Sequence, residues 1–377
     1  MLTRLRGRHY HTGQPIEIHC AEGRIVAVEP LANVPPDAGW IAPAFFDLQI
    51  NGCLGKAFVS PDLSEDDVHV VAAECQRHGM AGLCPTLITG GHAALAHGFT
   101  TLRRACESSP SLARVLPCFH LEGPYISPDD GPRGAHPREH VRPPDLDEFH
   151  RWQDCAGGRI RLVTLAPEHE TALPFIEALV REGVVVALGH TAASPRRIRE
   201  AIAAGARLST HLGNGSHAVL PRHDNYLWEQ LASDELTASF IPDGHHLPRA
   251  VLRCLVRVKT PARLIITCDA SSLAGMPPGR YSMWGQELEV HAGGKVTVPG
   301  TTFLAGSGVL TDACARTLLE QGDVTLSEVI TMACHNPRTL LGLPPIDLVV
   351  GAPADLIEVE CQPFRLRQTV VAGSVVE

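Results

Sequence analysis

The sequence contains few lysines and few aromatic residues. Its three lysines, at positions 56, 259 and 295, and a formal net charge of −9 argue against nucleic acid or an anionic membrane as the main partner. An anionic substrate must therefore be bound by individual Arg or His side chains. Residues 1–20 lack the continuous apolar segment of a signal peptide, and no later apolar run is long enough to span a bilayer, so we expect a cytoplasmic protein.

The sequence also lacks any closely spaced pair or cluster of cysteines. Its twelve cysteines are scattered singly from Cys20 to Cys361, without a CxxC motif. Several lie within apolar runs, as Cys268 does in LIITCDA, where a free thiol packs as a small hydrophobic group. We therefore expect reduced cysteines and no cysteine-based zinc site.

The order of β-rich and helical segments predicts the fold class. At 377 residues the chain can form one large barrel and a small additional domain. From residue 44 onward, eight short β-rich runs alternate with helical segments, which predicts an α/β fold with a closed parallel (β/α)8 TIM-like barrel. The runs are AFFDLQIN (44–51), GLCPTLIT (82–89), VLPCFHLEG (115–123), RLVTLAPE (161–168), VVVALGHT (184–191), LSTHLGN (208–214), TASFIPDG (237–244) and LIITCDAS (264–271).

Both ends of the chain consist of short alternating runs without helical segments. We predict that residues 1–42 and 346–377 together form a small β-sandwich domain, and that residues 43–345 form the barrel. Within the barrel, 281–298 resembles a β-hairpin insertion with Gly293-Gly294 at its turn. The Pro- and Arg-rich segment 127–144 follows the third strand as a long loop, and such loops often contribute to function.

Four side chains suited to metal binding or proton transfer lie at predicted strand ends. Glu122 ends the third strand, His190 the fifth, His211 the sixth and Asp269 the eighth. Because the carboxyl ends of barrel strands converge on one face, we expect these four groups to meet there. Two imidazoles and a carboxylate suit a catalytic Zn²⁺ with an open position for water, and the same ligands accept Fe²⁺, Mn²⁺ or Co²⁺.

A two-metal centre is not expected. Many barrel hydrolases hold two metals with a His-x-His pair after strand one and a carboxylated lysine at the end of strand four. Here Asp47 and Gln49 occupy the positions of the pair, and strand four has no lysine nearby. We therefore predict one divalent metal ion, with Gln49 as a neutral neighbour of the site and a candidate substrate contact.

Several ordered motifs resemble those of one known family. FDLQINGCLG, HLEGPY, GAHPREH, GHT, THLGN, IPDGHH, CDA and LAGS are similar to the motifs of the N-acetylglucosamine-6-phosphate deacetylases of the amidohydrolase superfamily. The resemblance extends over about residues 40–340. It implies that Glu122, His190 and His211 bind the metal, that Asp269 is the general base and acid, and that His136 faces the carbonyl oxygen of the substrate.

The same resemblance implies contacts to an amino-sugar phosphate. Asn214, the backbone at Gly215, Arg222 and His246 match the phosphate contacts of the family, and His246 would come from a neighbouring subunit. The resemblance therefore implies a homodimer. An Arg side chain suits a phosphate because its planar guanidinium donates two parallel hydrogen bonds.

The substrate loop departs from the family pattern. HLGNGSHAVLPRHDN lacks an aromatic residue and a methionine that are usual there, and His245 stands where an apolar residue is usual. We expect deacetylation of an N-acetylated amino-sugar 6-phosphate, with N-acetylglucosamine 6-phosphate as the first candidate. Two alternatives are a related amidohydrolase with another N-acyl substrate, and a catalytically silent barrel that binds a sugar phosphate.

Overall fold

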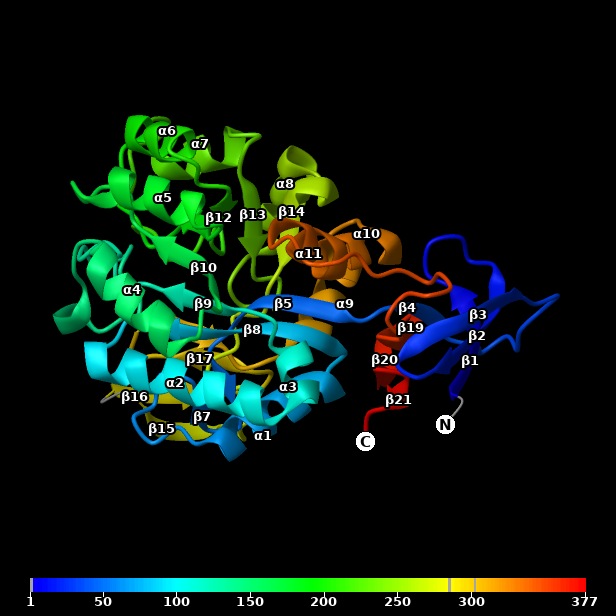
Figure 1. Cartoon of the computed structure of the whole chain (residues 1–377). Helices are drawn as coiled ribbons and strands as arrows, with labels where there is room; N and C mark the ends of the chain where they lie inside the picture. Colours follow the sequence, from blue (N-terminus) through cyan, green and yellow to red (C-terminus); the bar gives the residue numbers. More distant parts are fainter. Residues whose placement is uncertain (1–2, 284–285, 302) are drawn as a thin grey trace.

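The barrel predicted from the sequence is present in the computed structural model, which describes residues 3–283, 286–301 and 303–377 (Figure 1). Eight parallel strands lie side by side in the order β14-β13-β12-β11-β10-β9-β8-β5. All eight predicted strands are confirmed. They are β5 (Phe45–Ile50), β8 (Met80–Ile88), β9 (Phe119–Glu122), β10 (Ile160–Leu165), β11 (Val185–Leu188), β12 (Leu208–Ser209), β13 (Thr237–Phe240) and β14 (Leu264–Ile266).

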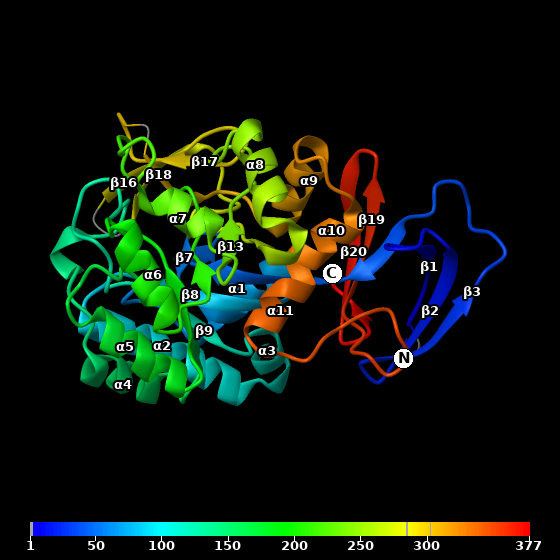
Figure 2. The same ribbon diagram turned by 90° about the horizontal axis from the view of Figure 1, so that it is seen from above.

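Helices surround the barrel and cover its outer face (Figures 1 and 2). In the first of them Ser64 caps the helix, and Val68, Val71 and Cys75 form a buried stripe at helical spacing. The helices are α1 (Glu65–Arg77), α2 (His92–Ser108), α3 (Pro110–Val115), α4 (Leu146–Cys155), α5 (Ala172–Arg181), α6 (Pro195–Ala203), α7 (Tyr226–Ala232), α8 (Arg249–Lys259), α9 (Thr311–Gln321), α10 (Leu326–Ile330) and α11 (Asn336–Leu340), with a π-helical turn at Thr331–His335 and 3-10 turns at Arg138–His140 and Pro261–Arg263.

The first and last barrel strands meet through few contacts. Between β5 and β14 the structure has one isolated parallel bridge, Ile50 to Ala270, and the Asn51 amide donates to the Ala270 carbonyl at 2.9 Å. The buried Asp47 carboxylate joins the same two strands and the start of α9. It accepts hydrogen bonds from the Gln49 amide (3.0 Å), the Thr267 hydroxyl (2.5 Å), the Cys268 amide (2.9 Å) and the Thr311 hydroxyl (2.6 Å).

The barrel interior is apolar towards the amino ends of the strands. One cluster of buried side chains contains a member from nearly every barrel strand, and Leu341, the residue after α11, also belongs to it. Inward-facing residues alternate along β9 and the segment before it, so Cys118 joins this cluster while His120 and Glu122 follow towards the carboxyl end. The cluster is Phe46, Leu48, Cys84, Cys118, Leu162, Ala187, Leu208, Ile265 and Leu341.

Strands from both chain ends form one additional sheet beside the barrel (Figures 1 and 2). The sheet is mixed and seven-stranded, which confirms that strands from both termini come together in one small β-structure. Its boundaries at residues 42 and 346 stay a prediction. In order the strands are β21 (Ser374–Val375), β20 (Phe364–Val371), β19 (Leu356–Cys361), β4 (Trp40–Pro43), β1 (Thr3–His9), β2 (Pro15–Ala21) and β3 (Arg24–Pro30).

The insertion after β14 is antiparallel. Its turn at Gly293 and Gly294 has φ of 85° at both residues, a conformation that glycine adopts without strain. This confirms the predicted turn, while residues 284 and 285 of the predicted hairpin lie outside the described residues. The strands are β15 (Gly279–Met283), β16 (Gln286–Val290), β17 (Lys295–Thr297) and β18 (Leu304–Ser307), and a separate short hairpin contains β6 (Gly52–Cys53) and β7 (Lys56–Ala57).

Two sequence-based expectations concern the chain as a whole. Among the described residues, no helix combines the length and the hydrophobicity that crossing a bilayer requires. The twelve cysteines are free thiols, and most of them are buried.

Candidate active site

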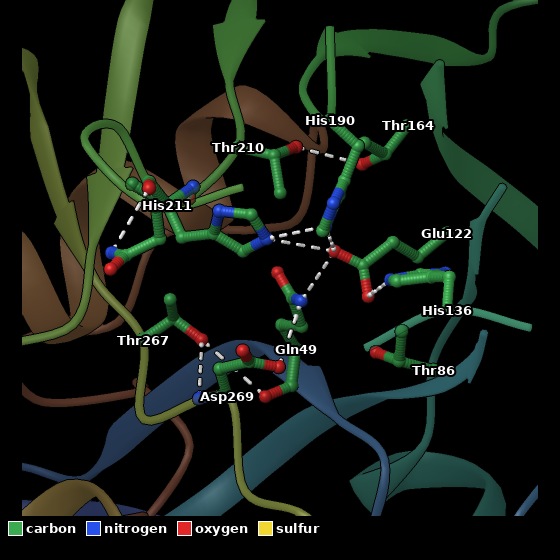
Figure 3. A network of polar contacts seen from close by, with 12 residues as sticks. Gln49, Thr86, Glu122, His136, Thr164, His190, Thr210, His211, Thr267 and Asp269 are labelled. Carbon is green, nitrogen blue, oxygen red and sulfur yellow. Dashed lines mark hydrogen bonds and ion pairs between the residues drawn. The ribbon is translucent and has the colours of Figure 1, made fainter. Parts of the chain in front are cut away.

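Three of the predicted side chains meet at one carboxylate oxygen (Figure 3). Glu122 Oε1 lies 3.3 Å from His190 Nε2 and 3.0 Å from His211 Nε2, and the two Nε2 atoms are 3.1 Å apart. All three residues are buried. Glu122 ends β9, and the two histidines lie just beyond β11 and β12, so the barrel brings them together as the strand-end argument predicted.

This geometry fits a single divalent cation. Nitrogen and oxygen ligands about 2.0–2.2 Å from one tetrahedral metal are about 3.3–3.6 Å apart, close to the separations of these three atoms. His190 Nδ1 donates to the Pro132 carbonyl at 2.8 Å, so in the neutral ring the Nε2 lone pair faces Glu122 and His211. The donor set therefore suits Zn²⁺ and similar metals.

A left-handed backbone places the key side chains. His190, His211 and Asp269 have φ of 51°, 29° and 49°. Residues other than glycine rarely adopt this conformation, and such strain is concentrated at functional sites. The positive φ at each of these residues directs the side chain that follows the strand towards the carboxyl-terminal opening of the barrel.

Gln49 connects the two carboxylates of the site. Its Nε2 donates to Glu122 Oε1 at 2.8 Å and to Asp269 Oδ1 at 2.9 Å, and Asn51 Nδ2 donates to the same Asp269 oxygen at 2.7 Å. Gln49 is almost fully buried and is not among the residues that line the cavity, and its contact to substrate stays a prediction. The strand pairing shifts between Asp47 and Ile50, and this irregularity breaks the alternation of side chains in β5.

The two carboxyl groups have opposite pKa shifts. Burial, followed by the negative charge of Glu122, raises the pKa of Asp269 to about 6. Burial also acts to raise the pKa of Glu122, but hydrogen bonds from His190 and His211 outweigh it and hold that pKa well below its ordinary value. Glu122 is therefore a permanent anion, whereas Asp269 can exchange a proton near neutral pH.

His136 lies on the other side of Glu122. The structure buries this residue of the long 127–144 loop and places its Nδ1 2.8 Å from the Thr89 hydroxyl. Its Nε2 is 4.0 Å from Glu122 Oε2, and the donor atoms of Glu122, His136 and His190 all lie within 4.8 Å of one another. Burial, followed by the nearby His190, lowers the pKa of His136 to about 3, so the ring is neutral at physiological pH.

Below the site lies a polar layer that the sequence reasoning missed. His120 Nε2 is 2.8 Å from the Thr164 hydroxyl, which is 2.7 Å from the Thr210 hydroxyl. Burial lowers the pKa of His120 to about 4. His120 is two residues before Glu122, and Thr210 directly precedes His211. These hydrogen bonds therefore help to fix the strand ends that carry two of the metal-ligand candidates.

The site opens into a cavity of about 260 Å³. Asp269 and the metal-ligand candidates lie on its wall together with His136. Asn214, Gly215 and His246 also line it, whereas Arg222 is exposed and does not line it. The remaining lining residues are Asn51, Ile88, Gly131, Gly134, Ala135, Gly213, Ser216, Ser271, Phe303, Leu304, Ala305 and Gly306.

Two residues predicted to contact substrate, His246 and Arg222, have different surroundings in the structure. His246 faces the cavity of its own chain, because the loop after β13 carries it there, so this contact needs no second subunit. The Arg222 side chain is exposed and is not among the residues that line the cavity. The homodimer itself stays a prediction.

Further residues of the site and its surroundings were not assigned from the sequence. Asn51 is hydrogen-bonded to Asp269, and Thr89 to His136. Asn51 and Thr89 are the last residues of predicted strands, and this position could have identified them. Asp243 accepts a hydrogen bond from the His246 ring at 2.8 Å and lies in the quoted IPDGHH motif. Phe303 gave no signal, because only the folded insertion brings it to the cavity.

Comparisons with known proteins identify the family of this chain. No protein-family model matches the chain. N-acetylgalactosamine-6-phosphate deacetylase of Escherichia coli O157:H7 is 33% identical over 339 residues, covering 89% of this chain and 87% of the relative. N-acetylglucosamine-6-phosphate deacetylase of Bos taurus is 36% identical over 351 residues, covering 89% of this chain and 83% of the relative.

A solved structure matches over the full length. N-acetyl-D-glucosamine-6-phosphate deacetylase from Mycobacterium smegmatis superimposes with a TM-score of 0.88 at 31% identity, and the match covers 100% of both chains. A mutant of that enzyme in complex with N-acetyl-D-glucosamine-6-phosphate has a TM-score of 0.87 at 30% identity, covering 99% of both chains. The chain therefore belongs to the N-acetylglucosamine- and N-acetylgalactosamine-6-phosphate deacetylase family of amidohydrolase enzymes.

Proposed function

We propose that the chain hydrolyses the acetamide of an N-acetylhexosamine 6-phosphate, with N-acetylglucosamine 6-phosphate as the first candidate, to acetate and the amino-sugar phosphate. One observation carries the proposal. A titratable carboxylate, Asp269, shares a cavity wall with the ligand set of Glu122, His190 and His211, and with a neutral imidazole, His136. Family membership supports the substrate class.

The proposed cofactor is one divalent cation, Zn²⁺ first, held by Glu122, His190 and His211. When bound, such a cation lowers the pKa of water and polarises a carbonyl. Asp269 takes the proton from the attacking water and returns it to the amine nitrogen as the C–N bond breaks. If the Thr89 hydroxyl donates to His136 Nδ1, the ring carries its proton on Nε2, which can donate to the carbonyl oxygen as negative charge develops there.

Acetate release from the purified protein tests the proposal. We expect turnover of N-acetylglucosamine 6-phosphate in the presence of Zn²⁺, measured beside N-acetylgalactosamine 6-phosphate and unphosphorylated N-acetylglucosamine. Faster turnover of the galactosamine substrate would favour the activity named for the E. coli relative. No acetate from any hexosamine 6-phosphate, with metal bound, would reject the proposal in favour of another N-acyl substrate.

The raised pKa of Asp269 predicts an acid limb in the pH profile. A general base must be ionised, so kcat/KM should fall as the pH decreases through the pKa of Asp269. That pKa is about 6 without metal, and a nearby cation favours the carboxylate, so we expect the limb at or below about 6. Bound metal is measured at each pH as a control. A limb centred above pH 7 with metal fully bound would contradict this assignment.

Phe303 is expected to contribute to binding of the sugar ring. Apart from histidines it is the one aromatic side chain among the described cavity-lining residues, and 56% of it is exposed. Aromatic rings pack against the apolar face of a sugar, so Phe303→Ala should raise KM roughly threefold to tenfold with little change in kcat. Val258→Ala, on the exposed face of α8, is the control. An unchanged KM in Phe303→Ala would remove Phe303 from the substrate site.

A further inference from the structure

His246 is held by a buried carboxylate in the loop after β13. Asp243 Oδ1 accepts hydrogen bonds from the backbone amides of His245 and His246 at 2.8 and 2.9 Å. Its Oδ2 accepts from His246 Nδ1 at 2.8 Å and from the Ser307 hydroxyl at 3.0 Å. The Asp243 side chain is 1% exposed and that of His246 is 5% exposed, so His246 lines the cavity and the Asp243 carboxylate is buried beside it.

The Asp243 carboxyl is ionised at neutral pH. Burial opposes its negative charge, but the hydrogen bond and the charge of His246 outweigh burial and lower the pKa of Asp243 to about 2. A permanently charged acceptor fixes the proton of His246 on Nδ1 and the orientation of the ring. Because Nδ1 is bound to Asp243, Nε2 is the ring nitrogen left for a ligand.

The cavity offers few other positive groups to an anionic substrate. Its described lining residues include no Arg or Lys. Two of its imidazoles, His190 and His211, belong to the metal-ligand set, and a third, His136, lies against that set with Nε2 4.0 Å from Glu122 Oε2. Among the described lining residues, His246 is thus the imidazole that lies apart from the metal-ligand set, with Nε2 available to an anionic group.

We propose that Asp243 is a positioning residue for substrate recognition: it holds His246 so that Nε2 donates to the anionic end of the sugar phosphate. In its protonated form an imidazole has two N–H groups, so it can donate one hydrogen bond to Asp243 and the other to an anion. The Asp243 carboxylate stabilises this protonated form, which is the one that binds the anion. This inference rests on the proposed function, and it assigns to Asp243 a role in choosing the phosphorylated substrate.

Selectivity for the phosphate tests the inference. The measured quantity is kcat/KM for N-acetylglucosamine 6-phosphate divided by kcat/KM for N-acetylglucosamine, in the metal-loaded wild type and in Asp243→Asn, His246→Ala and the double variant. Each single variant should lower this ratio about tenfold or more, through KM for the phosphorylated substrate, while kcat changes less than about threefold. The selectivity ratio of the double variant should fall no further than that of His246→Ala, because the two substitutions disrupt the same interaction with the phosphate.

The control is Ser307→Ala, which removes another donor to the same Asp243 oxygen and should keep the ratio within about twofold. An unchanged ratio in Asp243→Asn, or losses that multiply in the double variant, would overturn the inference. If Asp243→Asn does not fold, Asp243→Ser is measured in its place. A wild type that hydrolyses neither substrate refutes the proposed function instead, so the two failures are distinguishable.

Discussion

Asp269→Asn is expected to lower kcat by about 10²–10⁴-fold, the usual contribution of a general acid–base group, while one equivalent of metal stays bound. The amide cannot accept the proton of the attacking water or return one to the leaving amine. It still offers an oxygen to the Gln49 and Asn51 amides that now donate to Asp269 Oδ1. Acetate release and metal analysis of the same sample measure both quantities.

The stability of the variant provides a control for this interpretation. Asp269 is a buried carboxyl whose pKa is raised by burial and by the charge of Glu122, so loss of its charge should not destabilise the metal-free fold. We expect an equal or higher Tm for Asp269→Asn without metal. Retention of more than about a tenth of the wild-type kcat would show that another group transfers the proton.

Glu122→Gln is expected to abolish both metal binding and activity. Glu122 Oε1 lies next to both imidazole nitrogens and Gln49, so the neutral amide removes the one charged ligand of the set. Bound metal should fall from one equivalent to a small fraction, and kcat/KM should fall by about 10³-fold or more, since water activation depends on the cation. Metal content and acetate release are measured after dialysis against the same low metal concentration.

A second carboxylate controls for loss of a buried charge. Glu148 is buried and bound by Arg142 at 2.9 Å, and it does not line the cavity. Glu148→Gln should lower the Tm and keep one equivalent of metal. Added Zn²⁺ should raise the Tm of the wild type and of Glu148→Gln but not of Glu122→Gln, because a ligand stabilises only the fold that binds it. Full metal occupancy in Glu122→Gln would refute the assigned ligand set.

The barrel and its metal-ligand candidates could be predicted because they depend on local patterns. Alternating β-rich and helical runs specify the barrel, and its geometry brings strand ends together. Glu122, His190 and His211 therefore met as expected. The left-handed backbone at both histidines had no signal in the sequence, since tertiary contacts impose it.

Contacts made by loops and strand irregularities could not be predicted in the same way. A register shift in β5 turns Gln49 between the carboxylates, which simple alternation does not reveal. His136 lies in a Pro- and Arg-rich segment typical of a solvated loop, yet the fold buries it against Thr89. Arg222 has the chemistry of a phosphate ligand, but its loop leaves it exposed, and only three-dimensional packing decides between these outcomes.

The candidate catalytic groups lie on both sides of the junction between β5 and β14, the first and last strands of the barrel. Gln49 and Asn51 belong to its first strand and the turn after it, Asp269 follows its last strand, and the Asp47 carboxylate with one backbone bridge connects the two sides. Local separation of β5 from β14 would part Asp269 from the side-chain amides of Gln49 and Asn51 before the rest of the barrel unfolds. Local unfolding and loss of the proton-transfer geometry are therefore one event, and catalytic activity is a sensitive measure of barrel closure.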